Sequence, residues 1–362
     1  MADVNKALKP VESVTIAPLN EGSDFRSNSY ILFRLSSADL SMWLTNVSYL
    51  RLSLEVAARN GISVTGSSAN ATSSACYIRN AANLFKDVQV YYGGDLVYQQ
   101  PYNIEQNTLR MLNYGETYLR DNYATYTTAS MVNDGSAYLK LSNGTTSSAT
   151  AMNRPAQTIT DIIIPVNQLI PMFEDCDSHG FPMRGLRSQI EIRLYIAEPY
   201  RYLVDWSNSV KDFTNGTCTL SAGACAESIQ SRFPSTDITL TNVRLFCSHY
   251  VPDQNTAQVI DDKCRSAEGW GLRYTLWQTA LRQMPRISPS TNAIPFSVTT
   301  NNTKSMLLYC HKAGCSPSVM YRPFISSLYM KFGPNQLPYQ PIAGNPMETP
   351  FEYKFTSDDV LT

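Results

Sequence analysis

Charged residues are scarce in this sequence. Lysine, arginine, aspartate and glutamate make up 16% of the 362 residues and leave a formal net charge of -1, whereas roughly a quarter is usual for globular domains. No run of lysine or arginine occurs, and such a basic patch is what commonly marks a nucleic-acid-binding protein. The polar residues are instead serine, threonine, asparagine, glutamine and 22 tyrosines. Protein interfaces are enriched in tyrosine and depleted of lysine and glutamate, so this composition predicts extensive contacts with other protein chains.

Long hydrophobic runs are also missing. No stretch approaches the roughly 18 apolar residues that indicate a membrane-spanning helix, and residues 1–13 lack the apolar core of a secretory signal, so none is expected. The 8 cysteines are scattered, and we expect mostly reduced thiols, as in cytosolic proteins. Cys218 and Cys225 are the best candidates for a disulfide. Without a secretory route, the Asn-x-Ser/Thr triplets should remain unglycosylated.

One stretch, residues 237–252 (DITLTNVRLFCSHYVP), predicts a long β-strand on which the rest of the chain is organised. Its apolar positions are Ile238, Leu240, Val243, Leu245, Cys247 and Val251. Alternation with a period of two residues is typical of a strand with one buried face. The phase slips at residues 241–242, which predicts a β-bulge. We interpret this strand as the end of one folded unit and the lead into a second.

Strand patterns recur on both sides of this stretch, whereas helix patterns are rare. Further strands are predicted at 14–18, 30–35, 48–57, 158–166, 189–197, 271–284, 294–299, 304–310 and 326–333, with a hairpin at 83–100 that turns at 93–95. A helix is predicted at 103–112, a short helical turn or a loop at 167–172, and loops, insertions or connectors at 61–74, 117–160, 200–234 and 253–269. Many strands joined by long polar loops predict an all-β protein built of antiparallel sandwiches of the jelly-roll type.

The predicted division of the chain follows from the same pattern. We expect an N-terminal arm at 1–25, a first jelly roll at 26–252, and a second jelly roll at 253–362 that is short or truncated. The arm is too polar to pack alone and should lie on a neighbouring chain or on the surface of the first roll.

Candidate chemical sites are few, and each has a simpler structural explanation. The acidic stretch 174–179 could offer oxygen ligands to a cation, but it lacks the pattern of a calcium loop and is interpreted as a solvated loop. Cys310, His311 and Cys315, with Cys264 as the nearest other thiol, do not form the two close ligand pairs of a zinc site. His249 is interpreted as a hydrogen-bonded strand residue rather than a general base.

The remaining candidates also favour a structural interpretation. Glu191 lies beside Arg193 on an outward face, which predicts a surface cross-strand charge pair. No nucleophile elbow, metalloprotease helix, phosphate loop or dinucleotide-binding loop occurs in the sequence. We therefore predict no catalytic, cofactor-binding or metal-binding residues and no enzyme activity.

Three stretches resemble one known family. They are ITLTNVRLFCSHYVPD, VYYGGDLVYQQPYNIEQNTLRML and KSMLLYCHKAGCSPSVMYRPFISSLYMKFGPNQLPYQP. They resemble segments of the double jelly-roll major capsid proteins of Polintons, virophages and related DNA viruses. The second unit, 253–362, is about half as long as the first, so this roll is reduced, or the chain stops short of it, or the likeness is to another two-domain sandwich.

The resemblance carries expectations about function. It implies two rolls side by side, three copies in a pseudo-hexagonal capsomer, and an icosahedral shell around the genome. It implies contacts with neighbouring capsomers and with minor capsid and penton proteins, an internal membrane in some members, and the insertions 117–160 and 200–234 as tower or contact loops. It further implies synthesis in the host cytoplasm or nucleus, a place in the virion, no cofactor, no small-molecule substrate and no sequence-specific contact with nucleic acid.

Two other classes of protein remain open from the residues alone. One is a carbohydrate-binding or adhesive β-sandwich, which would need a secretion route and exposed aromatic residues on one sheet face. The other is a β-sandwich hydrolase such as a glycoside hydrolase, which would need two carboxylates or a nucleophile–base pair in a cleft.

Overall fold

The computed structural model of the chain describes residues 11–20, 25–63, 75–78, 81–101, 139–142, 145–148, 151–176, 180–205, 233–267, 269–271, 305–308, 327–332, 335–343 and 351–354. Four predictions lie outside these residues: the helix at 103–112, the strand at 294–299, the pair Cys218 and Cys225, and the strand at 271–284 except for its first residue. All strand pairs in the described part are antiparallel, as predicted for an all-β sandwich.

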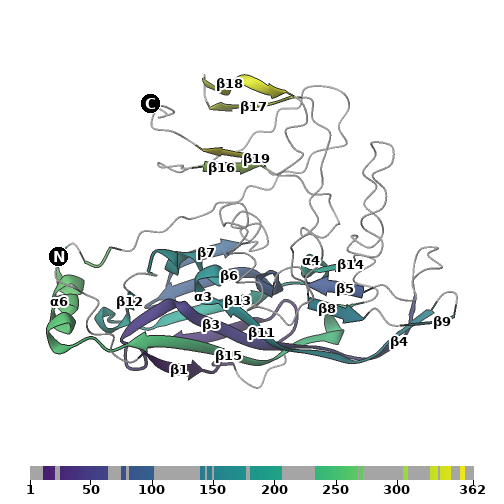
Figure 1. The fold of residues 1–362 in the computed structure, drawn as a ribbon, viewed down its shortest axis with the longest axis horizontal. Helices are drawn as coiled ribbons and strands as arrows, with labels where there is room; N and C mark the ends of the chain where they lie inside the picture. Colours follow the sequence, from purple (N-terminus) through teal and green to yellow (C-terminus); the bar gives the residue numbers. More distant parts are fainter. Residues whose placement is uncertain are drawn as a thin grey trace.

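Two sheets form the main body (Figure 1). The first sheet contains, in spatial order, β1 (Glu12–Ile16), β15 (Ile238–Tyr250), β3 (Met42–Val56) and β11 (Gln157–Pro165), and the short strand β12 (Phe181–Pro182) also pairs with β3. The second sheet contains β2 (Tyr30–Leu35), β13 (Ile190–Ile196), β6 (Phe85–Tyr92) and β7 (Asp95–Pro101).

The order of the strands in the two sheets defines a jelly roll. Taken along the chain, the eight strands are β1, β2, β3, β6, β7, β11, β13 and β15. The first pairs with the eighth, the second with the seventh, the third with the sixth and the fourth with the fifth. Nested pairing of this kind is what results when one long hairpin of four strand pairs rolls up into two facing sheets, which is the jelly-roll arrangement. The fold class predicted from the sequence is confirmed for this roll.

The facing sides of the two sheets form a single hydrocarbon core. On β13 every second residue is buried, at Ile190, Ile192, Leu194 and Ile196, as the alternation predicted. The other inward residues of the roll that are at most 2% exposed include Ile31, Phe33, Leu35, Leu50, Leu52, Leu54, Val88, Val90, Ile162, Ile164, Leu240 and Val243. Burial of these side chains, at about 1.5–3 kcal/mol each, holds the two sheets together.

The predicted bulge in the organising strand is present in β15. The pairing with β3 shifts between Thr241 and Arg244, and Asn242 has a φ of 51°. Asparagine tolerates this left-handed conformation better than most residues. Because of the bulge, the side chains of Val243, Leu245 and Cys247 point into the core on the same side of the sheet as Leu240. Val251 was expected on the apolar face as well, and this is wrong, because β15 ends at Tyr250 and Val251 is 45% exposed.

Strand β3 begins six residues before the strand predicted at 48–57. The first residues of β3 were missed because a second bulge interrupts the apolar alternation of the sequence there. The register with β15 shifts between Phe246 and Ser248, so residues 45–48 of β3 bulge out. The hydroxyl of Ser48 accepts hydrogen bonds from the Trp43 ring nitrogen at 3.0 Å and from the Ser248 backbone nitrogen at 2.9 Å. One buried side chain thus replaces the missing backbone partner, and the apolar alternation is broken although the strand continues.

Three connections of the roll are long and contain strands of their own: 57–84 between β3 and β6, 102–156 between β7 and β11, and 197–237 between β13 and β15. Their strands are β4 (Arg59–Ser63), β5 (Ala75–Ile78), β8 (Leu139–Ser142), β9 (Thr145–Ser148), β10 (Ala151–Arg154) and β14 (Leu203–Asp205). They pair as two small sheets, β4–β10–β9 and β14–β5–β8. The loop expected at 61–74 and the insertions expected at 117–160 and 200–234 are therefore partly strands, which their low hydrophobic periodicity concealed.

Short helical turns complete the described part of the roll. They are η3 (Ala81–Leu84), α3 (Val166–Leu169), η4 (Pro171–Cys176), η5 (Met183–Gly185), α4 (Pro199–Tyr202) and η7 (Ser235–Asp237). The helical turn or loop expected at 167–172 is a helical turn, formed by α3 and η4. The glycine turn expected at 93–95 is confirmed too, because Gly93 and Gly94 have φ of 61° and 97° between β6 and β7.

A helix, α6 (Gln254–Arg265), follows the organising strand where a polar connector was expected. Asp253 caps it by accepting a hydrogen bond from the Thr256 backbone nitrogen at 2.8 Å. Only Ala257 and Ile260 are buried, so the apolar stripe was too narrow to indicate a helix. The prediction of a connector at 253–269 is wrong because a cap and one short contact face are enough to fix this helix.

Helix α6 is attached to the roll by an ion pair and a close backbone approach. Arg184 on η5 donates two hydrogen bonds of 2.9 Å to the Asp261 carboxylate. A β-carbon at Gly185 would overlap the Cys264 side chain, so a larger residue there would displace the helix.

Beyond the helix, the described residues form two antiparallel strand pairs. One pair is β16 (Ser305–Leu308) with β19 (Phe351–Lys354), and the other is β17 (Ser327–Phe332) with β18 (Asn335–Ala343). The strands predicted at 304–310 and 326–333 are confirmed. The proline-rich end was not predicted to form strands, but β18 includes Pro338 and Pro341, which a strand tolerates on a side without a ladder partner.

We predict that Asp261→Asn weakens the docking of α6. The Arg184 guanidinium, through its hydrogen bonds, holds the pKa of the Asp261 carboxyl below its usual range, with burial opposing. Both side chains are about a quarter exposed, so solvent screening limits the pair to about 1 kcal/mol. A lowered pKa in the folded state means that this contribution is complete above about pH 4 and is lost as the pH falls through the lowered pKa.

The measurement is urea unfolding of the wild type, Asp261→Asn and the matched control Asp262→Asn, whose side chain is exposed on the same helix. Only Asp261→Asn should be less stable at pH 7, and its difference from the wild type should shrink below about pH 4. Equal losses in both variants would contradict the assignment.

Candidate functional site

The sites considered in the sequence do not come together as a reactive centre in the part of the chain that the structure describes. The side chains of 174–179 and of 310–315 lie outside it. Within it, no group of three or more histidine, cysteine, aspartate or glutamate residues could hold a metal ion. None of its helices has the length and hydrophobicity needed to cross a bilayer.

His249 lies on the inward side of β15 and is 5% exposed. Its Nε2 atom is 3.9 Å from a carboxylate oxygen of Glu12 on β1, and its Nδ1 atom has no hydrogen-bond partner among the described residues. His249 is a strand residue as predicted, but the hydrogen bonds expected of its side chain are not found among the described residues. Cys247, two residues away on the same side, is fully buried, and burial raises the pKa of its thiol. A nucleophilic cysteine is favoured by the opposite shift and by partial exposure, which Cys247 does not have.

Glu191 belongs to a charge network on the outer face of the second sheet. It lies directly opposite Arg34 on β2, whose guanidinium donates to it at 2.8 Å, and Arg193 on its own strand donates at 3.3 Å. These hydrogen bonds, that from Arg34 first, lower the pKa of the Glu191 carboxyl. Arg193 also lies over the ring of Tyr91, 4.1 Å from its centroid. The predicted surface charge pair is confirmed, with Arg34 as its cross-strand partner.

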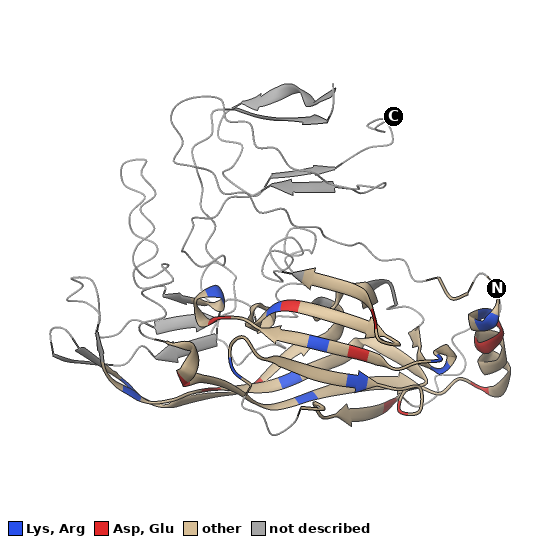
Figure 2. Ribbon diagram, turned by 180° about the vertical axis from the view of Figure 1, so that it is seen from behind, with Lys and Arg blue, Asp and Glu red and all other residues tan. Residues whose placement is uncertain are grey.

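Aromatic side chains mark the outer faces of both sheets. On the first sheet, the rings of Tyr49 and Phe246 stack at 4.9 Å with an interplanar angle of 16°. On the second, the rings of Tyr30 and Tyr195 lie 5.5 Å apart. Figure 2 shows acidic and basic residues interspersed along the described strands of the sandwich rather than gathered by sign. The described outer faces are therefore of the mixed aromatic and polar kind found in contacts between proteins.

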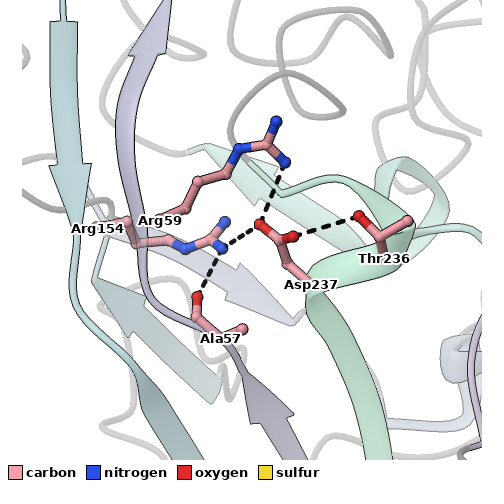
Figure 3. Close-up of polar contacts among 5 residues, drawn as sticks. All are labelled: Ala57, Arg59, Arg154, Thr236 and Asp237. Carbon is pink, nitrogen blue, oxygen red and sulfur yellow. Dashed lines mark hydrogen bonds and ion pairs between the residues drawn. The ribbon is translucent and has the colours of Figure 1, made fainter.

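A buried charge cluster lies where the long connections leave the roll (Figure 3). The side chain of Arg154, at the end of β10, has no solvent exposure, and its Nη2 atom donates to a carboxylate oxygen of Asp237 at 2.6 Å and to the carbonyl oxygen of Ala57 at 2.8 Å. Its guanidinium carbon lies 4.8 Å from the centre of the Phe233 ring. Arg59 approaches the same Asp237 oxygen at 3.4 Å from a more exposed position.

This Arg154 cluster, as we name Ala57, Arg59, Arg154, Phe233 and Asp237, was not foreseen in the sequence. Arg154 stands at the end of a polar insertion, and Asp237 looked like an ordinary start of a strand. Nothing in the local sequence links two residues that are 83 positions apart. The structure brings them together because β10 runs into β11 beside β3, and η7 runs into β15 on the other side of β3.

No protein-family model matches the sequence, and no characterised protein matches it in sequence. Solved structures do match. The mavirus major capsid protein is 14% identical, with 71% of this chain and 51% of that one covered and a TM-score of 0.38. The Faustovirus major capsid protein is 12% identical, with 71% and 57% covered and a TM-score of 0.36.

A quasi-atomic model of the PBCV-1 virus capsid matches as well, at 13% identity, with 70% of this chain and 44% of that one covered and a TM-score of 0.33. The chain thus spans about half the length of the structures it matches. These structures are viral capsid proteins, the class that the sequence resembles. Their TM-scores are low, and the jelly-roll assignment is carried by the strand order itself.

We predict that Glu191→Gln leaves the fold nearly as stable as the wild type. The Arg34 side chain is 43% exposed, so solvent screens the pair and its loss should cost less than about 1 kcal/mol. Leu194→Ala on the same strand should cost about 2–5 kcal/mol, because it opens a cavity between the sheets. Thermal unfolding of both variants tests this contrast, and a larger loss for Glu191→Gln would show that the network does more than cover the surface.

Proposed function

We propose that this protein is the major capsid protein of a DNA virus. It associates as pseudo-hexagonal trimers, and the trimers form an icosahedral shell around the genome. The observation that carries the proposal is a complete eight-stranded jelly roll whose interior is filled by hydrocarbon side chains. A jelly roll that binds a small molecule inside needs a cavity lined by a few polar groups.

The interior of this roll leaves little room for such chemistry. Its core is a continuous cluster of leucine, isoleucine, valine and aromatic residues. The buried side chains of Thr45 and Ser48 are engaged in hydrogen bonds to the protein itself. The functional surface is therefore the outside of the roll and its long connections, which favours a protein that works by contact with other proteins rather than by catalysis.

The composition supports contact with copies of the same chain. Burying charge at an interface is costly unless it is paired, and this chain carries 16% charged residues and 22 tyrosines. On the outer faces of the sheets, some exposed charges are already paired within the chain, as at Arg34 with Glu191 and at Arg51 with Asp161. A neighbouring copy can cover these paired charges at a lower cost than isolated ones.

The division of the chain belongs to this proposal. We assign an arm at 1–25, a first roll at 26–252 and a second, shorter roll at 253–362. The strand pairs β16–β19 and β17–β18 would belong to the second roll. The arm is joined to the first roll through β1, which lies at the edge of a sheet beside β15, and it thereby supplies the first strand of the nested order.

The partners follow from the proposed role. They are two further copies in the trimer, neighbouring capsomers, and minor capsid and penton proteins, with an internal membrane beneath the shell only in some capsids of this kind. The protein would be found in the virion after synthesis in the host cytoplasm or nucleus. Sequence-specific contact with the genome, a cofactor and a small-molecule substrate have no part in this function.

We predict that the purified chain forms trimers. Light scattering after size exclusion should give about three times the chain mass of 40.4 kDa, and negative-stain images should show hexagonal outlines or closed shells. Dilution should dissociate the trimers, since homomeric contacts follow mass action. A chain that stays monomeric at high concentration would contradict the proposal and would favour a carbohydrate-binding protein or a hydrolase.

A further inference from the structure

The three long connections of the roll, 57–84, 102–156 and 197–237, meet in two small sheets and in the Arg154 cluster. The sheet β14–β5–β8 takes one strand from each connection: β5 from 57–84, β8 from 102–156 and β14 from 197–237. The sheet β4–β10–β9 takes its strands from the first and the second connection. We name these two small sheets together the cap. The cap is thus made of segments that are far apart in the sequence and that have little hydrophobic periodicity.

The Arg154 cluster joins the same three connections at the point where they meet the roll. Ala57 and Arg59 begin the first connection, Arg154 ends the strand through which the second returns to the roll, and Asp237 ends the third (Figure 3). Phe233, also near the end of the third connection, lies under the Arg154 guanidinium. The backbone reinforces this contact, because the Ala57 nitrogen donates to the Asp237 carbonyl oxygen at 2.8 Å. Two charged side chains thus connect the roots of all three segments.

The burial of Arg154 makes this contact conditional. A guanidinium without solvent exposure is stable only where its charge is compensated and its N–H groups have acceptors. The carboxylate of Asp237 compensates the charge, and this carboxylate and the carbonyl of Ala57 both accept hydrogen bonds from the Nη2 atom. The buried position of Arg154 beside Phe233 is therefore stabilised when the third connection has returned to start β15 and the first has left β3.

We infer that the Arg154–Asp237 pair anchors the cap to the roll, so that the three connections become ordered together rather than one by one. The position of the pair outside the two main sheets means that the cap depends on it and the roll does not. Loss of the pair releases the cap, whereas the core between the two main sheets remains closed, because the pair touches this core through the Phe233 ring alone among the contacts described for it. This inference concerns the fold alone and holds whether or not the chain is a capsid protein.

The test is hydrogen–deuterium exchange of the full chain, measured by mass spectrometry for the wild type and Asp237→Asn. The variant removes the charge and keeps the shape of the side chain. Exchange in β4, β5, β8, β10 and β14 should become at least about tenfold faster, since local opening sets these rates. Strands β6 and β13 of the roll should stay protected over the same labelling time.

Asp161→Asn is the matched control. Asp161 pairs with Arg51 on the same sheet, but both side chains are about half exposed, so its loss should leave exchange in the cap unchanged. Unchanged exchange in Asp237→Asn would overturn the inference. So would an equal loss of protection in β6 and β13, or a variant that does not fold, because the pair would then be part of the core of the roll.

A second variant separates the ion pair from other effects of residue 237. Arg154→Met removes the buried charge that Asp237 compensates. In an Arg154→Met background, adding Asp237→Asn should change exchange in the cap less than about twofold, since interacting residues are not additive. A full tenfold effect in that background would show that Asp237 acts through another partner and would contradict the inference.

Discussion

The fold depends on the meeting of two inward faces, each built from every second residue of its strands. A slip of one residue would turn a whole strand inside out, so the phase of each strand has to be kept over long distances. Strands β3 and β15 keep it by bulges, at 45–48 and at 241–244, where the chain gains or loses register and then returns to the core. Asn242 and Ser48 make these bulges possible, one by its backbone conformation and one by its hydroxyl.

The hydrocarbon core packs the two sheets together but does not determine how the long connections outside it are arranged. The roll pairs charges on its surface and buries one arginine at its end, where the three connections leave. A buried ion pair adds little net stability, yet removal of one partner is costly. The cap strands are weakly hydrophobic, so packing alone does not select one arrangement for them. A buried ion pair can make that selection.

The sequence was a good guide to the core and a poor guide to the connections. Clean alternation predicted β13 and β2 almost to the residue, and the phase slip at 241–242 predicted the bulge of β15. Helix α6 was missed because only Ala257 and Ile260 face the protein. The pair of Arg154 and Asp237 was missed because it depends on strands brought together from distant parts of the chain, and neither residue stands in a local pattern. Hydrophobic periodicity in a sequence indicates which face of a strand is buried. It does not indicate a single long-range contact such as the one between Arg154 and Asp237.

The most direct test of this account concerns the closure of the roll, in which the first strand pairs with the eighth. Val14 on β1 lies directly opposite Cys247 on β15, so Val14→Cys refolded under oxidising conditions should form a disulfide with Cys247 within one chain. Thr15→Cys, the next residue and on the other face of β1, should not form it. Peptide mass mapping of the two variants decides the matter. An intrachain disulfide between position 14 and Cys247 is the predicted result, and its absence, or a link only between chains, would contradict the nested pairing on which the fold depends.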